Sequence, residues 1–212
     1  MSSTAQPLPI VVLISGNGSN LQAIIDAIQA GLPARICAVI SNRPQAYGLS
    51  RAREAGIPVE VIDHRDYPSR EAFDQALMAC IDHYQPKLVV LAGFMRILTD
   101  EFVKHYSGRM INIHPSLLPR YQGLNTHQRV LDAGDDIHGV SVHFVTPELD
   151  SGPVILQAKI PVQANDDADT LAQRIHEQEH IIYPQVIRWF AEGRLHLQGN
   201  SVLLDDEKSG PG

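Results

Sequence analysis

Short apolar runs alternate with segments of helical spacing along the first half of this chain. Apolar runs at 10–15, 35–40 and 59–62 are each followed by a segment with apolar residues at helical spacing, and a fourth run follows at 87–92. Because these runs are apolar at successive positions, they predict strands that are buried on both faces of a sheet. The alternation predicts an α/β fold with a doubly wound, mostly parallel sheet, whose ligands bind beyond the carboxyl ends of the strands.

The later part of the chain predicts antiparallel strands. Segments 139–145 and 154–161 are extended and follow one another without a long helix between them, which indicates a hairpin-like pair. A long helix is expected at 168–191 and a short hairpin at 195–204.

Composition and charge limit the class of protein. The chain has 212 residues, 44% of them hydrophobic, so we expect a single domain over 1–212 with flexible ends at about 1–8 and 205–212. The net charge is -7 and the basic residues are scattered, which is unfavourable for nucleic acid or an anionic membrane. No apolar run reaches the roughly 18 residues of a membrane span, and neither a signal peptide nor a disulfide framework is evident. We expect a cytoplasmic protein, and composition leaves open whether it is a monomer or a homodimer.

A glycine-rich loop, Gly16 to Asn20, joins the first predicted strand to the first predicted helix. Free backbone N–H groups and the helix dipole at such a junction favour a phosphate. Leu21 stands where a dinucleotide fingerprint has its third glycine, and no Lys-Ser/Thr pair follows the glycines, so neither NAD nor a nucleoside triphosphate is expected. The same residues can serve only as a tight turn with a helix cap, and the loop by itself does not decide between these interpretations.

Asn112 and His114 form the strongest candidate for catalysis. They lie two residues apart, and Pro115 directly follows, so both side chains point the same way at the end of a strand. An amide and an imidazole placed in this way can stabilise an oxyanion and transfer a proton, which indicates acyl transfer. The Asp150 carboxylate, on a separate loop, can set the charge state of the imidazole. Sequence spacing cannot bring Asp150 to His114, so a packing histidine and a turn aspartate stay open as alternatives.

The segment His176-Glu177-Gln178-Glu179-His180 is a rival site. It matches the HExxH pattern on a predicted helix, which places two imidazoles one turn apart, as a zinc-dependent hydrolase requires. Only His196 follows nearby as a third ligand, and it lies in a predicted strand. The segment is better interpreted as a solvated helix flank or as a set of substrate contacts.

The chain resembles the phosphoribosylglycinamide formyltransferases. The resemblance is carried by residues 15–21, 91–98, 112–119 and 142–153, and it extends to about residue 195. It implies a Rossmann-like formyltransferase fold and the transfer of a formyl group from 10-formyltetrahydrofolate to the amino group of 5-phosphoribosylglycinamide, the third step of purine synthesis. Neither a metal nor a nicotinamide cofactor is implied. Other folate formyltransferases, formyltetrahydrofolate deformylase and the zinc-dependent hydrolase are the alternatives.

The same resemblance implies roles for individual residues. The catalytic residues would be Asn112, His114 and Asp150. The phosphoribosylglycinamide would contact Gly18, Ser19, Asn20 and Glu179. The folate would contact Arg70, Met95, Arg96, Ile97, Leu98, Asn112, Val145 and Asp150. In the family a basic residue often precedes the glutamate by three positions, and in this chain that position holds His176.

Direct transfer through a tetrahedral intermediate is the mechanism that the resemblance implies. Asn112 would donate to the oxyanion, and a protonated His114 would supply a second donor and then a proton for the departing folate nitrogen. Asp150 would favour the imidazolium. A covalent formyl-enzyme is unnecessary, because the positioned amine is itself the nucleophile. The cis or trans state of the Leu118-Pro119 bond is left open.

Overall fold

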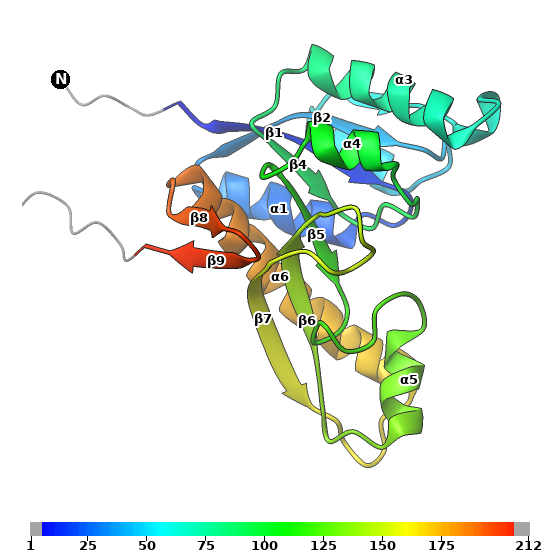
Figure 1. The fold of residues 1–212 in the computed structure, drawn as a ribbon, viewed down its shortest axis with the longest axis vertical. Coiled ribbons are helices and arrows are strands. Elements are labelled where there is room, and N and C mark those ends of the chain that lie inside the picture. The colour runs from blue at the N-terminus through cyan, green and yellow to red at the C-terminus, as the bar shows by residue number, and fades with distance from the viewer. Residues whose placement is uncertain (1–5, 206–212) are drawn as a thin grey trace, which may run out of the picture.

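Figure 1 shows the fold in a computed structural model, which describes residues 6–205. Its helices and strands are, in chain order, β1 (Leu8–Ile14), α1 (Ser19–Gln29), β2 (Ala34–Ser41), α2 (Gly48–Glu54), β3 (Val59–Val61), the 3₁₀ helix η1 (His64–Asp66), α3 (Arg70–His83), β4 (Leu88–Leu91), α4 (Asp100–His105), β5 (Met110–His114), α5 (Thr126–Ala133), β6 (Ile137–Phe144), β7 (Val154–Pro161), α6 (Ala168–Ala191), β8 (Leu195–Gln198) and β9 (Ser201–Leu204). The four apolar runs of the first half are strands β1 to β4, as predicted.

The strands form one seven-stranded sheet in the order β3-β2-β1-β4-β5-β6-β7. The pairs from β3 across to β5 are parallel, and β6 and β7 continue the sheet as antiparallel strands. The expected doubly wound, mostly parallel sheet with antiparallel strands in its C-terminal part is therefore confirmed. Strands β8 and β9 form the expected short hairpin, which is a separate antiparallel sheet.

Helices cover both faces of the sheet (Figure 1). Alternate residues of β1 point to opposite faces, so that Ile10 and Val12 belong to one buried cluster and Val11 and Leu13 to the other. Helices α1, α2 and α6 pack on the first face, and α3 and α4 pack on the second. The apolar character of the strands at successive positions follows from this burial on both sides.

Two short helices are absent from the sequence prediction. Helix α4 has six residues and α5 has eight, and their buried residues, Phe102 and Val103 in α4 and Thr126 and Val130 in α5, include no apolar pair at helical spacing. Helix α4 begins at a local cap, because the Thr99 hydroxyl accepts a hydrogen bond from the Phe102 N–H at 3.3 Å.

The two ends of the described chain are attached to the fold. Leu8 belongs to β1, and the Asp205 N–H donates to the Arg194 carbonyl at 2.9 Å, so the first and last of these residues take part in backbone pairing. Residues 1–5 and 206–212, on which most of the expectation of flexible ends falls, lie outside the described residues. The Leu118-Pro119 peptide bond is cis. None of the helices within 6–205 combines the length and the apolar character that a membrane span requires.

Candidate active site

Strand β5 carries the predicted amide and imidazole to the carboxyl end of the parallel sheet. Asn112 is paired with His143 of β6, and the Asn112 Nδ2 atom lies 3.3 Å from His143 Nε2. His143 Nδ1 lies 2.9 Å from the Phe144 carbonyl oxygen, so this nitrogen carries the proton and Nε2 is left to accept from Asn112. Burial lowers the pKa of His143, which keeps the ring neutral and suited to this role. The contact fixes which way the Asn112 amide faces.

The structure brings Asp150 to His114. Asp150 Oδ2 lies 3.5 Å from His114 Nδ1, and both residues are buried, with 9% and 7% of their surface exposed. The other ring nitrogen, Nε2, lies 2.9 Å from the Tyr121 carbonyl oxygen, which can only accept a hydrogen bond. Both neighbours of the imidazole are therefore acceptors. The Gly123 N–H also donates to Asp150 Oδ2 at 2.9 Å, which ties the 115–125 loop to the carboxylate.

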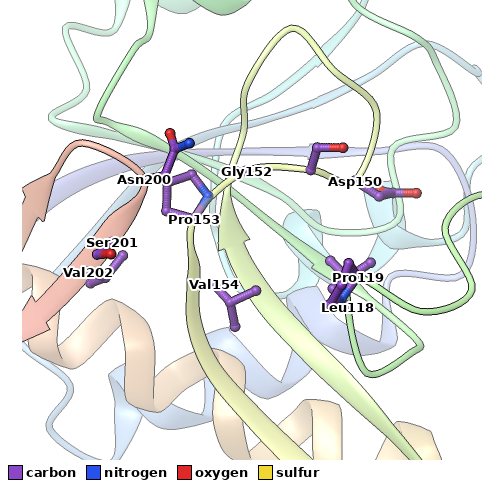
Figure 2. A pocket seen from close by; sticks show the side chains of 10 residues that line it. Leu118, Pro119, Asp150, Gly152, Pro153, Val154, Asn200, Ser201 and Val202 are labelled. Carbon is purple, nitrogen blue, oxygen red and sulfur yellow. The ribbon is translucent and has the colours of Figure 1, made fainter.

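The loop that carries Asp150 is held in an unusual backbone conformation. Asp150 has a positive φ of 50°, and its carbonyl accepts from Gln122 Nε2 at 3.2 Å. Gly152 follows at a position where a Cβ atom would overlap the Phe144 carbonyl. Figure 2 shows that the Asp150 side chain points away from Pro153. A cavity of about 490 Å³ lies behind this loop, between Pro119 and the β8-β9 hairpin.

The glycine loop forms the second part of the site. Gly18 caps helix α1 with a φ of 77°, and a Cβ there would lie 2.6 Å from Gly48 Cα, so both the conformation and the close approach require glycine. Within residues 6–205, no protein acceptor is bonded to the N–H groups of Gly18, Ser19 and Asn20. These N–H groups at the start of a helix can bind an anion.

Helix α6 closes the site beside this loop. Asn20 Nδ2 donates to Glu179 Oε2 at 3.0 Å, so the two residues predicted for one substrate lie in contact. Glu179 is buried, and this burial raises the pKa of its carboxyl, although the Asn20 hydrogen bond and the charge of His176 act in the opposite direction. His176 Nε2 lies 4.0 Å from Glu179 Oε2 and its side chain is half exposed.

The HExxH segment does not assemble three ligands. In the part of the chain that the structure describes, no group of three His, Cys, Asp or Glu side chains could hold a metal ion. His196, the only nearby third candidate, instead contacts Asp205 at 2.7 Å in the terminal hairpin. Glu179, which is the fourth residue of the motif, is the side chain that faces the glycine loop through Asn20.

The predicted folate contacts surround the carboxyl end of β4. Met95 and Ile97 are exposed apolar side chains, while Leu98 and Val145 pack against the buried cluster under α3 and α4. Val145 also donates its N–H to the Met110 carbonyl, which places it beside β5.

The charges of Arg70 and Arg96 both act on Asp74. Burial raises the pKa of Asp74, and the charges of both arginines lower it, as does the hydrogen bond from the Thr99 N–H. The Arg96 guanidinium lies 5.6 Å from the centre of the Phe73 ring, and its Nε atom is buried without a hydrogen-bond partner among the described residues. A buried donor without a protein partner is expected where a bound ligand supplies the hydrogen-bond acceptor.

Sequence reasoning missed several residues of the site. His143 lies in a segment that the sequence singled out, but only the pairing of β5 with β6 places it against Asn112. Tyr121 and Gly123 contact His114 and Asp150 through backbone atoms, which carry no side-chain signal. Ser15 accepts from the Met95 N–H at 2.8 Å and so connects the first strand to the predicted folate segment.

The chain is similar to formyltransferases over nearly its whole length. The sequence model of the formyl transferase family matches residues 8–187. Phosphoribosylglycinamide formyltransferase of Escherichia coli (strain K12) is 57% identical over 203 residues, which cover 95% of this chain and 96% of that protein. The trifunctional purine biosynthetic protein adenosine-3 of Bos taurus is 46% identical over 92% of this chain, which corresponds to 19% of that protein. The structure of phosphoribosylglycinamide formyltransferase from Coxiella burnetii in complex with CHES is 63% identical, with a TM-score of 0.91 over 94% of each chain.

Proposed function

This chain belongs to the formyl transferase family, and we propose that it transfers a formyl group from 10-formyltetrahydrofolate to the amino group of 5-phosphoribosylglycinamide, the third step of purine synthesis. One observation carries the proposal: Asn112, His114 and Asp150 converge at the sheet edge that also presents the unpaired N–H groups of the glycine loop. The first group suits formyl transfer, and the second suits a phosphorylated acceptor.

Asn112 acts as the oxyanion donor. Its Nδ2 atom has two hydrogens, of which His143 accepts one, so the other can bind the oxygen of the formyl group as charge develops. Because His143 orients the amide, the donor is in place before the reaction begins. This arrangement stabilises the tetrahedral centre that forms when the amine attacks the formyl carbon.

His114 acts as the second donor and as the proton carrier. Asp150 stabilises the charged imidazolium through the 3.5 Å contact with Nδ1. Nε2 then donates to the oxyanion and delivers a proton to the departing folate nitrogen, and the proton that the attacking amine loses restores the imidazolium. In the structure the Tyr121 carbonyl accepts a hydrogen bond from His114 Nε2. The 115–125 loop must therefore break this hydrogen bond when the substrates bind.

The two substrates occupy opposite sides of this group. The phosphate of 5-phosphoribosylglycinamide binds Gly18, Ser19 and Asn20, and Glu179 accepts from its ribose hydroxyls. The folate lies against Met95, Arg96, Ile97, Leu98 and Val145, near Asn112 and Asp150, with its acidic tail towards Arg70. The exposed apolar side chains and the unpartnered Arg96 Nε support this assignment.

A single assay tests the function against its alternatives. The absorbance change that accompanies loss of the formyl group from the folate is followed with 5-phosphoribosylglycinamide supplied or withheld. We expect turnover only when the acceptor is present. Formate release without the acceptor would indicate a deformylase, and loss of activity on chelation together with stoichiometric zinc would indicate the hydrolase.

The remaining expectations belong to the same proposal. Residues 1–212 act as a single formyltransferase domain, as a monomer or homodimer in the cytoplasm, on small molecules rather than on nucleic acid or membranes. Catalysis needs no metal ion.

A further inference from the structure

A phosphate at the glycine loop needs positive charge that the loop itself does not supply. Residues 16–20 contain no Lys or Arg, and position 176 holds a half-exposed histidine 4.0 Å from Glu179. The nearest helix on the other side, α2, carries Arg51. The inference drawn below rests on the proposed function, because it concerns the phosphate of the same substrate.

Arg51 holds the glycine loop with two hydrogen bonds to a single residue. Its Nε donates to the Asn17 carbonyl at 2.9 Å, and its Nη2 donates to Asn17 Oδ1 at 2.8 Å. A third, longer bond joins Nη1 to Gln22 Oε1 at 3.5 Å, and the guanidinium lies 4.9 Å from the centre of the Tyr47 ring. The planar guanidinium is therefore held on several sides in one orientation.

The bond to the Asn17 carbonyl also sets the direction of the next N–H group. In a trans peptide the C=O and N–H bonds point in opposite directions, so fixing the Asn17 carbonyl fixes the Gly18 N–H. The loop has no room to adjust, because Gly18 lies against Gly48, and the Gly48 N–H donates to the Gly16 carbonyl at 3.0 Å. Arg51 therefore acts on the first donor of the anion site.

The charge of Arg51 is not neutralised by a carboxylate of the described residues. No carboxylate among residues 6–205 forms an ion pair with it, and its three hydrogen bonds go to neutral oxygens, so two of its five N–H groups remain. The charge of Arg51 also acts on helix α6, because the pKa of His180 is lowered by burial and then by the charges of His176 and Arg51. Arg51 contacts the glycine loop through Asn17, and its charge also acts on His180 of α6.

We propose that Arg51 is a positioning residue for the substrate phosphate, which orients the Gly18 N–H through Asn17 and supplies the positive charge beside the glycine loop. Lysine cannot replace it fully, because an ammonium group cannot occupy the Nε and Nη2 positions together.

Steady-state kinetics of three variants test this role. Arg51→Met keeps much of the side-chain bulk and removes the charge and the donors, Arg51→Lys keeps the charge, and Arg53→Met makes the same charge change at an exposed position of the same helix. We expect Arg51→Met to raise KM for 5-phosphoribosylglycinamide by about 10- to 100-fold, the effect of losing charge-assisted hydrogen bonds, with kcat and KM for the folate little changed. Arg51→Lys should recover part of the loss, and Arg53→Met should behave as the wild type.

A substrate without the phosphate separates positioning from a purely structural role. With glycinamide riboside as acceptor, Arg51→Met should react at nearly the wild-type rate. An equal loss with both acceptors, an unchanged KM, or the same effect in Arg53→Met would overturn the proposal. If Arg51→Met does not fold, the same comparison is made between Arg51→Lys and the wild type.

Inorganic phosphate provides a readout that does not depend on the reaction. We expect phosphate to raise the Tm of the wild type and of Arg53→Met, and to raise it much less in Arg51→Met. If the wild type has no acceptor-dependent activity, the proposed function fails, and this measurement still decides whether Arg51 serves an anion site: an equal shift in all three proteins would contradict it.

Discussion

The substitution Gly152→Ala is expected to lower kcat although residue 152 has no side chain at the reacting centre. A Cβ atom there would overlap the Phe144 carbonyl oxygen and lie 2.8 Å from the Phe144 carbonyl carbon. Non-bonded carbon atoms need about 3.5 Å, so the two backbone segments must separate by at least about 0.7 Å. Phe144 cannot give way freely, because its N–H donates to the Pro153 carbonyl at 3.0 Å and its carbonyl binds His143 Nδ1.

The displacement acts on both catalytic contacts. Asp150 lies two residues before the added methyl group, and His143 orients Asn112. A misplacement of about 1 Å can cost about 100-fold in rate, so we expect kcat to fall by about 10- to 100-fold while KM for 5-phosphoribosylglycinamide changes little. The overpacking should also lower the free energy of unfolding by about 1 to 3 kcal/mol.

The control is Gly56→Ala, at the end of α2. Gly56 also has a positive φ, of 70°, but nothing lies within 4 Å of an added Cβ. This variant should lose about 1 kcal/mol of stability from backbone strain and keep full activity. Kinetics are measured well below the Tm of each variant. Wild-type kcat in a folded Gly152→Ala protein would refute the reasoning, as would an equal kcat loss in Gly56→Ala.

Three further predictions follow from single contacts. Asn112→Ala should lower kcat by about 100-fold or more, since it removes the proposed oxyanion donor, and a variant with normal turnover in the acceptor-dependent assay would rule out that role. Burial and the neighbouring His127 lower the pKa of His138 to about 4, so between about pH 4 and 6.5 the unfolded chain binds more protons than the folded protein, and stability falls as pH drops through this window. In urea unfolding, His138→Gln should flatten this dependence of the unfolding free energy on pH. An unchanged pH dependence in the variant would contradict this role of His138. Tyr183→Phe should lower the free energy of unfolding by about 1 to 2 kcal/mol, because the buried hydroxyl donates to the carbonyls of Leu91 and Ile111; denaturation without change in the midpoint would show that these contacts contribute nothing.

The parallel strands were predictable because their signal is local. Burial on both faces leaves an apolar run in the sequence, as at 10–15, and the glycines after it mark the turn. The short helices α4 and α5 gave no such signal, because their buried residues include no apolar pair at helical spacing. The glycine loop was also recognisable, although the sequence left open whether it is only a turn or also an anion site. The structure adds that its N–H groups have no protein acceptor among residues 6–205 and that Asn20 contacts Glu179, which supports the proposed anion site.

Long-range contacts explain what could not be predicted. The resemblance to a family suggested that Asp150 faces His114, but the residues between them do not imply it. Only the antiparallel return of β6 and the turn at Gly152 bring the carboxylate to the imidazole. His143 and Arg51 were missed for the same reason, since their partners Asn112 and Asn17 lie more than 30 residues away.

The sequence by itself determined which chemical groups are candidates for the site and at which strand ends they lie. Asn112, His114 and the glycine loop are assigned to those ends by the alternation of apolar runs and by Pro115, which depend only on residues nearby in the chain. The tertiary structure decided which groups meet, how the Asn112 amide is oriented, and which acceptors surround His114. The physical reason is that side-chain periodicity is set by local backbone geometry, whereas proton sharing and charge depend on atoms within about 4 Å in space, whatever their separation along the chain.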